Sequence, residues 1–182
     1  MDLIINDDKL QVKEIDEFNT KVRALLITED NQVLVANYGG VLLLPGGSVE
    51  PREPIVKAII RELKEETGRD YKAKEFRYLT CLEYFQKNYP KRDGSYQNRL
   101  IKTYYFVVDY KEPLKGAQSL SESEQRGNFK LQLVPLNELE KLNSVNNTDN
   151  PRNIYFQKEL SAIIKFYKDM QEDMSEKRKQ LK

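Results

Sequence analysis

The 182-residue sequence contains no histidine and only one cysteine, Cys81. The absence of histidine excludes Ser-His-Asp and Cys-His nucleophile systems. It also excludes zinc sites built on histidine, and one cysteine cannot supply a thiolate zinc site. No disulfide can form within the chain, which fits a reducing compartment, so we expect a cytoplasmic protein. Acid–base and metal chemistry is therefore left to carboxylates, lysine and metal-bound water.

The chain also lacks long apolar runs and a large net charge. No stretch approaches the ~20 apolar residues that a spanning helix needs. The start, MDLIINDDKL, has no basic segment followed by a long apolar one, so we expect no signal peptide and no membrane association. The net charge of +1 provides no global field that would attract nucleic acid, and no DNA partner is expected. The length predicts a single domain over residues 1–182.

Hydrophobic patterns along the chain predict alternating strands and helices. We expect an arm or short strand over residues 1–20 and a frayed tail over 174–182. Runs of β-branched and aromatic residues predict strands at 21–28, 32–38, 41–44, 73–86, 100–110 and 130–135. Helices are predicted at 54–67, 136–142 and 153–173. The hairpins exclude a purely parallel sheet and the long helices need faces to cover, so the pattern predicts an α/β fold with a mixed sheet between helices.

The stretch LPGGSVEPREPIVKAIIRELKEETGR, from Leu44 to Arg69, concentrates the charged residues that suggest chemistry. Three carboxylates, Glu62, Glu65 and Glu66, lie at i, i+3 and i+4 and share one helix face, where like charges cost roughly 0.2–0.5 kcal/mol per pair. A solvated helix face usually alternates the two signs of charge. A divalent cation such as Mg²⁺, which takes oxygen ligands and bridges to phosphates, would relieve this repulsion. The pattern therefore favours a metal site over a solvated acidic face.

The same stretch resembles the signature motif of the Nudix hydrolases. The matching residues are Gly47, Glu53, Arg61, Glu62, Leu63, Glu65, Glu66 and Gly68. Seven of these positions, all but that of Leu63, are strictly specified, and at roughly 7% each they give on the order of 10⁻⁸ per register by chance. Arg69 departs from the motif, because the family expects an apolar residue there, and we expect this to affect the start of the next strand but not the metal site.

The resemblance implies a Nudix-like α/β/α sandwich with a mixed β-sheet and a pyrophosphohydrolase that depends on Mg²⁺ or Mn²⁺. It implies that Glu62, Glu65 and Glu66 are metal ligands. Glu53 either joins them or orients Arg61, and its alternative role is to stabilise the start of the helix as a negative charge. Arg61 would hold a glutamate through a charge-assisted hydrogen bond, or would otherwise be a surface cation.

The resemblance leaves two candidates for the general base. Glu62 ranks first, because both the motif and the helix geometry fix its place. Glu124 lies in the loop 111–129, from which related enzymes often supply a further glutamate, and Glu122 lies close enough to be confused with it. The alternative for the loop is an ordinary polar connection.

Several further residues are candidates for substrate binding. Gly46 and Gly47 would let the backbone approach the acidic helix without interference from a Cβ atom. The polar stretch 87–99 predicts a hairpin with a basic tip, whose phosphate-binding candidates are Lys91, Arg92 and Arg99. A solvated loop is the alternative. Tyr84 could stack on a base, as a tyrosine near this place does in some dinucleoside-polyphosphate Nudix enzymes, or could pack in the core.

Two function classes follow from these residues. The first is a hydrolase that cleaves the diphosphate linkage of a nucleoside triphosphate, a dinucleoside polyphosphate or a nucleotide sugar. The second is a non-catalytic Nudix-like module that senses a nucleotide. Degenerate glutamates or an appended DNA-binding domain would favour the second class, and this chain shows neither. The nucleotide itself is not specified by the sequence, and a homodimer is left open.

Overall fold

The computed structural model describes residues 2–91, 93–111, 118–120, 125, 128–144 and 151–180. The strands are β1 (Leu3–Ile5), β2 (Glu17–Ile27), β3 (Gln32–Tyr38), β4 (Val41–Leu43), β5 (Arg77–Pro90), β6 (Tyr96–Asp109) and β7 (Lys130–Pro135). The helices are α1 (Ile55–Thr67), α3 (Leu139–Ser144) and α4 (Pro151–Gln180). Two 3₁₀ turns are η1 (Val12–Glu14) and η2 (Ala73–Glu75).

The strands form one seven-stranded sheet in the order β1-β5-β6-β2-β3-β4, with β7 also paired to β3. β5 and β6 pair antiparallel, whereas β2 runs parallel to β6 from Glu17, opposite Arg99, to Ile27, opposite Asp109. β1 lies parallel to β5 at the sheet edge. The predicted mixed sheet is confirmed.

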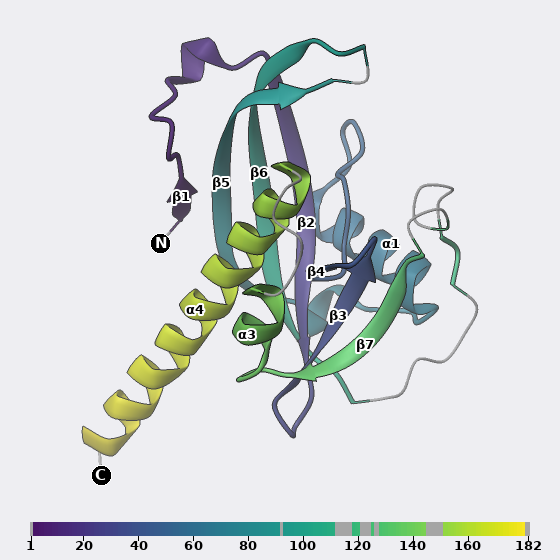
Figure 1. Cartoon of the computed structure of the whole chain (residues 1–182). Helices are drawn as coiled ribbons and strands as arrows, with labels where there is room; N and C mark the ends of the chain where they lie inside the picture. Colours follow the sequence, from purple (N-terminus) through teal and green to yellow (C-terminus); the bar gives the residue numbers. More distant parts are fainter. Residues whose placement is uncertain are drawn as a thin grey trace.

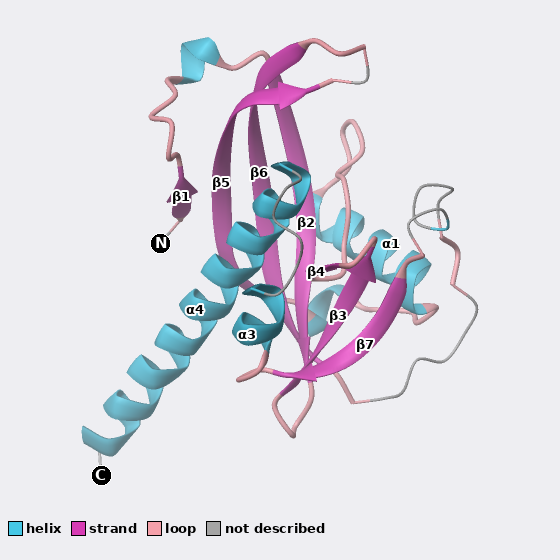
Figure 2. Cartoon of the chain, in the orientation of Figure 1, coloured by secondary structure: helices cyan, strands magenta, loops and turns pink. Residues whose placement is uncertain are grey.

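Helices cover both faces of the sheet, with α1 on one side and α4 and α3 on the other (Figures 1 and 2). The alternation of side chains along β2 explains how one strand serves both layers. Val22 and Leu26 pack with Ile59 of α1, whereas Leu25 packs with Ile163 of α4. The predicted α/β/α sandwich is therefore confirmed.

Helix α1 matches its prediction almost to the residue. Pro54 is the N-cap rather than the first helical residue, with ψ of 138°, and its carbonyl accepts from the N–H groups of Lys57 and Ala58. Gly68 follows the predicted end at residue 67 and ends the helix in the left-handed conformation at φ 69°. Ile59, Leu63 and Thr67 of α1 are buried, and the first two pack in one cluster with residues of the sheet.

Several predicted element bounds were wrong. Most of the stretch 87–99 is strand, because β5 continues to Pro90 and β6 begins at Tyr96. A two-stranded ribbon beyond the core needs backbone pairing but no apolar face. Its polar sequence therefore has no strand-like hydrophobic pattern, and the strand was not predicted there. β2 begins at Glu17 because it pairs with β6 along its whole length. α3 begins only at Leu139, and α4 continues past the predicted end at residue 173 to Gln180.

Arg69, the one departure from the motif, is held beside the end of α1. Its guanidinium donates to Glu75 at 2.7 Å and lies 4.8 Å from the ring centre of Tyr71. The 3₁₀ turn η2 follows, and β5 begins only at Arg77. Among the helices in the described ranges, none is both long and apolar enough to cross a membrane.

Candidate active site

Helix α1 buries two of its three motif glutamates. Glu62 and Glu66 are only 9% and 2% exposed, because they lie beside the apolar face that packs on the sheet. The Glu65 side chain is 41% exposed. Burying a carboxylate is costly unless hydrogen bonds or opposite charge compensate it, so the partners of Glu62 and Glu66 define the site.

The glycine loop between β4 and α1 is fixed against β2. The N–H groups of Val22 and Ala24 donate to the carbonyls of Gly47 and Pro45, at 3.0 and 2.9 Å. Gly46 has φ of 131°, and a Cβ there would lie 2.2 Å from the carbonyl oxygen of Val22. Only glycine fits this close approach.

This loop meets the acidic helix at both glycines. The N–H of Gly46 donates to Oε2 of Glu66 at 2.8 Å. A Cβ on Gly47 would lie 2.3 Å from Oε2 of Glu62, so the missing side chain makes room for that carboxylate. The predicted role of Gly46 and Gly47, a backbone that approaches the acidic helix, matches this geometry.

Arg61 joins three parts of the site. Its Nε and Nη2 donate to the two carboxylate oxygens of Glu53, each at 2.9 Å, and Nη1 donates to Oε1 of Glu62 at 2.8 Å. Nη2 also donates to the carbonyl of Ser48 at 2.9 Å. Oε2 of Glu65 lies 3.6 Å from Nη1.

The charges of this cluster stabilise one another. The hydrogen bonds from Arg61 hold the pKa of Glu53 below its ordinary value, and those to Glu53 and Glu62 raise the pKa of Arg61. Glu53 also accepts from the N–H of Glu50 at 3.0 Å. Glu53 is therefore an anion, and its position is fixed through Arg61.

Glu62 and Glu66 of α1 have different hydrogen-bond partners. Within the described ranges, no group of three or more acidic, histidine or cysteine side chains is arranged to hold a metal ion. Glu62 instead contacts Arg61 and Glu66 contacts the Gly46 amide. The donor set is nonetheless entirely oxygen, which is the chemistry that a hard divalent cation takes. The residues present fit Mg²⁺ or Mn²⁺ in donor type.

Two of the predicted substrate-binding side chains, Tyr84 and Arg99, lie against aromatic rings. Tyr84 is buried and packs edge-on against Tyr155, with ring centres 4.9 Å apart, which matches the core-packing alternative. Arg99 lies 3.5 Å from the ring centre of Tyr89. Lys91 is exposed at the hairpin tip. Arg92, Glu122 and Glu124 lie outside the described residues.

The loop 111–129 reaches the end of α1 where it is described. Gln118 Nε2 donates to the carbonyl of Glu66 at 2.6 Å, and the N–H of Ser119 donates to the carbonyl of Glu65 at 2.8 Å. These contacts bring the loop to the acidic helix. They lend support to the prediction that the loop serves the site, while its glutamates remain a prediction.

Sequence reasoning missed a buried charged group beside the glycine loop. Arg23 of β2 and Glu159 of α4 form an ion pair at 3.0 Å, and the side chain of each is 4% exposed. A signal was available: Arg23 interrupts the apolar run from Val22 to Ile27, and a charge at such a position needs a partner. The identity of the partner was not available, because Glu159 is 136 residues away.

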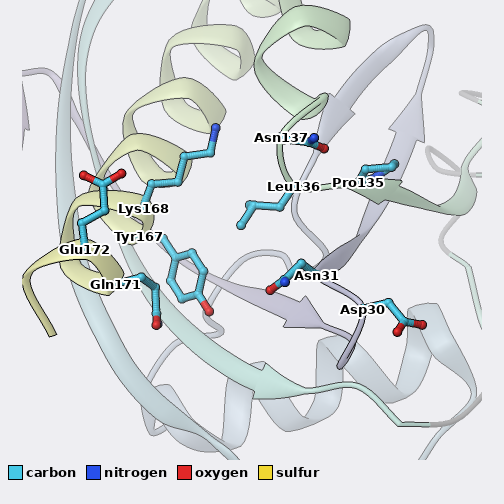
Figure 3. Close-up of a pocket in the computed structure, with 9 residues that line it drawn as sticks. All are labelled: Asp30, Asn31, Pro135, Leu136, Asn137, Tyr167, Lys168, Gln171 and Glu172. Carbon is cyan, nitrogen blue, oxygen red and sulfur yellow. The ribbon is translucent and has the colours of Figure 1, made fainter. Parts of the chain in front are cut away.

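A separate surface pocket of about 530 Å³ lies at the far end of α4, near the β2–β3 turn (Figure 3). Tyr167, Lys168 and Gln171 of α4 line it together with Asn31 and Asn137. None of its lining residues was predicted to belong to the site.

Comparisons with known proteins agree with the motif. A family model described as NUDIX domain matches residues 17–155. A comparison with curated proteins gives no match. The fold is similar to that of the MutT protein from Methanosarcina mazei Go1, with 16% identity, coverage of 84% of this chain and 97% of that chain, and a TM-score of 0.51.

Two other solved structures are similar at lower scores. The E. coli ORF135 protein is 20% identical, with 84% of this chain and 94% of that chain covered and a TM-score of 0.49. A mutator MutT protein from Bacillus halodurans is 21% identical, with 68% and 72% covered and a TM-score of 0.48.

Proposed function

The chain belongs to the Nudix family, and from this premise we propose that it is a divalent-metal-dependent pyrophosphohydrolase. Its substrate class is a nucleoside diphosphate derivative: a nucleoside triphosphate, a dinucleoside polyphosphate or a nucleotide sugar. The observation that carries the proposal is that Arg61 links Glu53 and Glu62 beside the glycine loop. A nucleotide-sensing module would have no need to retain every motif glutamate in this arrangement.

Glu62, Glu65 and Glu66 would hold Mg²⁺ or Mn²⁺, with Glu53 either as a further ligand or as an orienting partner of Arg61. When bound, such a cation neutralises charge on the diphosphate and makes water more acidic. Glu66 is kept beside the loop by the Gly46 amide, and Arg61 fixes Glu53 and Glu62 before substrate arrives. This prior ordering reduces the reorganisation that the reaction requires.

In the proposed reaction a water oxygen attacks one phosphorus of the diphosphate. A new P–O bond forms, the bond from that phosphorus to the bridging oxygen breaks, and the bridging oxygen leaves with the second phosphate. A carboxylate takes the proton from water, with Glu62 the first candidate and Glu124 the second. Lys91, Arg92 and Arg99 are proposed to contact phosphate, and Tyr84 remains a weaker proposal for base contact because it is buried.

The test is a panel of the three nucleotide classes with Mg²⁺ or Mn²⁺ in ¹⁸O-labelled water. We expect hydrolysis of at least one class, with the label in one phosphate product, and no hydrolysis with EDTA. Glu65→Gln is the loss-of-activity control: it removes a proposed metal ligand, and because the Glu65 side chain is partly exposed, the change should leave the core undisturbed. Tight nucleotide binding without turnover of any class would contradict the proposal and favour a sensing module.

A further inference from the structure

A buried ion pair connects helix α4 to the strand that supports the glycine loop. Nε of Arg23 in β2 donates to Oε1 of Glu159 in α4 at 3.0 Å. The hydroxyl of Tyr105 in β6 donates to the same oxygen. Nη1 of Arg23 donates to the carbonyl of Leu44. One guanidinium therefore links α4 with the residue that leads into the glycine loop.

Stability alone does not explain why this position holds a buried ion pair. Two charges removed from water lose hydration that their attraction only partly restores, and apolar residues of similar volume often serve as well. Oε2 of Glu159 is buried and has no hydrogen-bond partner among the described residues. Leu25, Leu160 and Ile163, which are close to the pair in the sequence, belong to the apolar cluster on this side of the sheet. An apolar pair of residues could not make the hydrogen bond that Arg23 donates to the Leu44 carbonyl.

The bond to Leu44 continues into the active site. Ala24, the residue after Arg23, donates its N–H to the carbonyl of Pro45 at 2.9 Å. The next residue, Gly46, donates its own N–H to Glu66 at 2.8 Å. A Cβ on Gly46 would lie 2.8 Å from the Cα of Arg23, so loop and strand are in direct contact. A shift of the Leu44 carbonyl would therefore move the donor that fixes Glu66.

We propose that Arg23 and Glu159 are positioning residues of the active site, which hold the Leu44 carbonyl and thereby keep the Gly46 amide on the Glu66 carboxylate. The proposal deepens the proposed function and rests on it for its effect on turnover. Its effect on the Gly46 amide does not depend on any activity. Helix α4, which lies across the sheet from α1 (Figure 1), thus contributes to the geometry of the glutamates.

The planar fork of arginine is essential to this role. Nε and Nη1 point to two acceptors at once, whereas the single ammonium of lysine keeps the charge without the fork. In Arg23→Lys we expect kcat to fall by about 10–100-fold, as for other residues that orient ligands, with KM within about twofold because substrate contacts are unchanged. We also expect the Gly46 amide to exchange its hydrogen at least ten times faster, measured by NMR without metal.

The double variant Arg23→Met with Glu159→Met separates positioning from stability. Methionine fills similar volume and leaves no unpaired charge, although the Leu44 carbonyl and the Tyr105 hydroxyl lose a partner. The melting temperature of the double variant should therefore fall by less than in a variant that removes one of the two charges alone. We expect its kcat to remain low and its Gly46 amide to remain poorly protected. Arg77→Lys is the matched control, because Arg77 forms an exposed two-bond pair with Asp109 on the same sheet. The control should change neither readout.

If the double variant keeps wild-type kcat and Gly46 protection, the pair is only structural and the proposal is overturned, whatever Arg23→Lys does. If Arg23→Lys does not fold, the double variant decides alone. If the wild type hydrolyses no nucleotide, the proposed function fails, and Gly46 exchange still decides whether the pair positions the loop.

Discussion

Arg61 holds Glu53 through two parallel hydrogen bonds, from Nε to Oε1 and from Nη2 to Oε2, each 2.9 Å long. This two-bond geometry is the strongest form of arginine–carboxylate contact. The residues are eight positions apart, and the contact closes the loop between the glycines and α1. Two properties follow from it: the charge of Glu53 is fixed, and the fold gains a contribution that depends on pH.

Glu53→Gln should reduce the acid sensitivity of folding. The folded-state pKa of Glu53 lies below its ordinary value of 4.5, so its contribution is fully present above that value and is lost as pH falls through the lowered pKa. Urea unfolding should show the variant less stable at pH 7, with the difference from wild type shrinking below pH 4.5. Glu50→Gln is the control, since Glu50 is exposed and 4.0 Å from Arg61. A difference independent of pH would contradict this reading.

Gly46→Ala should lose stability, whereas Gly47→Ala should lose activity. A Cβ on Gly46 meets backbone at 2.2 Å and φ is 131°, so we expect a loss of about 1–3 kcal/mol in the free energy of unfolding. For a Cβ on Gly47 the three nearest atoms all belong to the Glu62 carboxylate, which can rotate away, so Gly47→Ala should fold normally and lose activity. Thermal melts and hydrolysis rates for both variants check this. Equal melting temperatures for the two would contradict it.

Glu65→Gln and Glu66→Gln should each lower turnover on the order of 10²-fold, as removal of one preorganised charge does. Both should keep their stability or gain slightly, because a like-charge pair disappears. In Glu66→Gln the amide oxygen can still accept from Gly46. The measurements are hydrolysis at several Mg²⁺ concentrations and melting without metal. Near-normal turnover in both variants would remove these residues from the metal site.

The general base can be identified from pH–rate profiles at saturating metal. We expect Glu62→Gln to lose more kcat than Glu122→Gln or Glu124→Gln, because α1 and Arg61 fix the place of Glu62. Its profile should lose the acid-side decline that titration of the base produces. If Glu124→Gln alone abolishes kcat while Glu62→Gln retains most of it, the loop carries the base.

The basic hairpin tip offers a test of substrate contact. If Lys91, Arg92 and Arg99 grip phosphate, the triple alanine variant should raise KM more than it lowers kcat, and wild-type binding should weaken with salt. Arg99 also packs on Tyr89, so Lys91→Ala is the cleaner single change. An unchanged KM would mean that the tip is a solvated loop.

The sequence alone was sufficient to place α1 and its acidic stripe. Pro54 and Gly68 favour the start and the end of a helix through their own backbone conformation. The shared face of Glu62, Glu65 and Glu66 follows from the helical repeat. Such features depend on neighbours within a few residues, so they can be predicted without knowledge of the fold. The mixed sheet followed from the same reasoning, because hairpins are local and helices need a surface to cover.

The tertiary structure alone decided which distant partners the buried carboxylates and Arg23 contact. The Gly46 amide meets Glu66 across 20 residues, and Arg23 meets Glu159 across 136. The hairpin strands extend into a polar stretch because β5 and β6 pair there through backbone hydrogen bonds. Such pairing cannot be predicted from the local sequence. Burial and partner choice depend on which distant segments pack together, and no local periodicity carries that information.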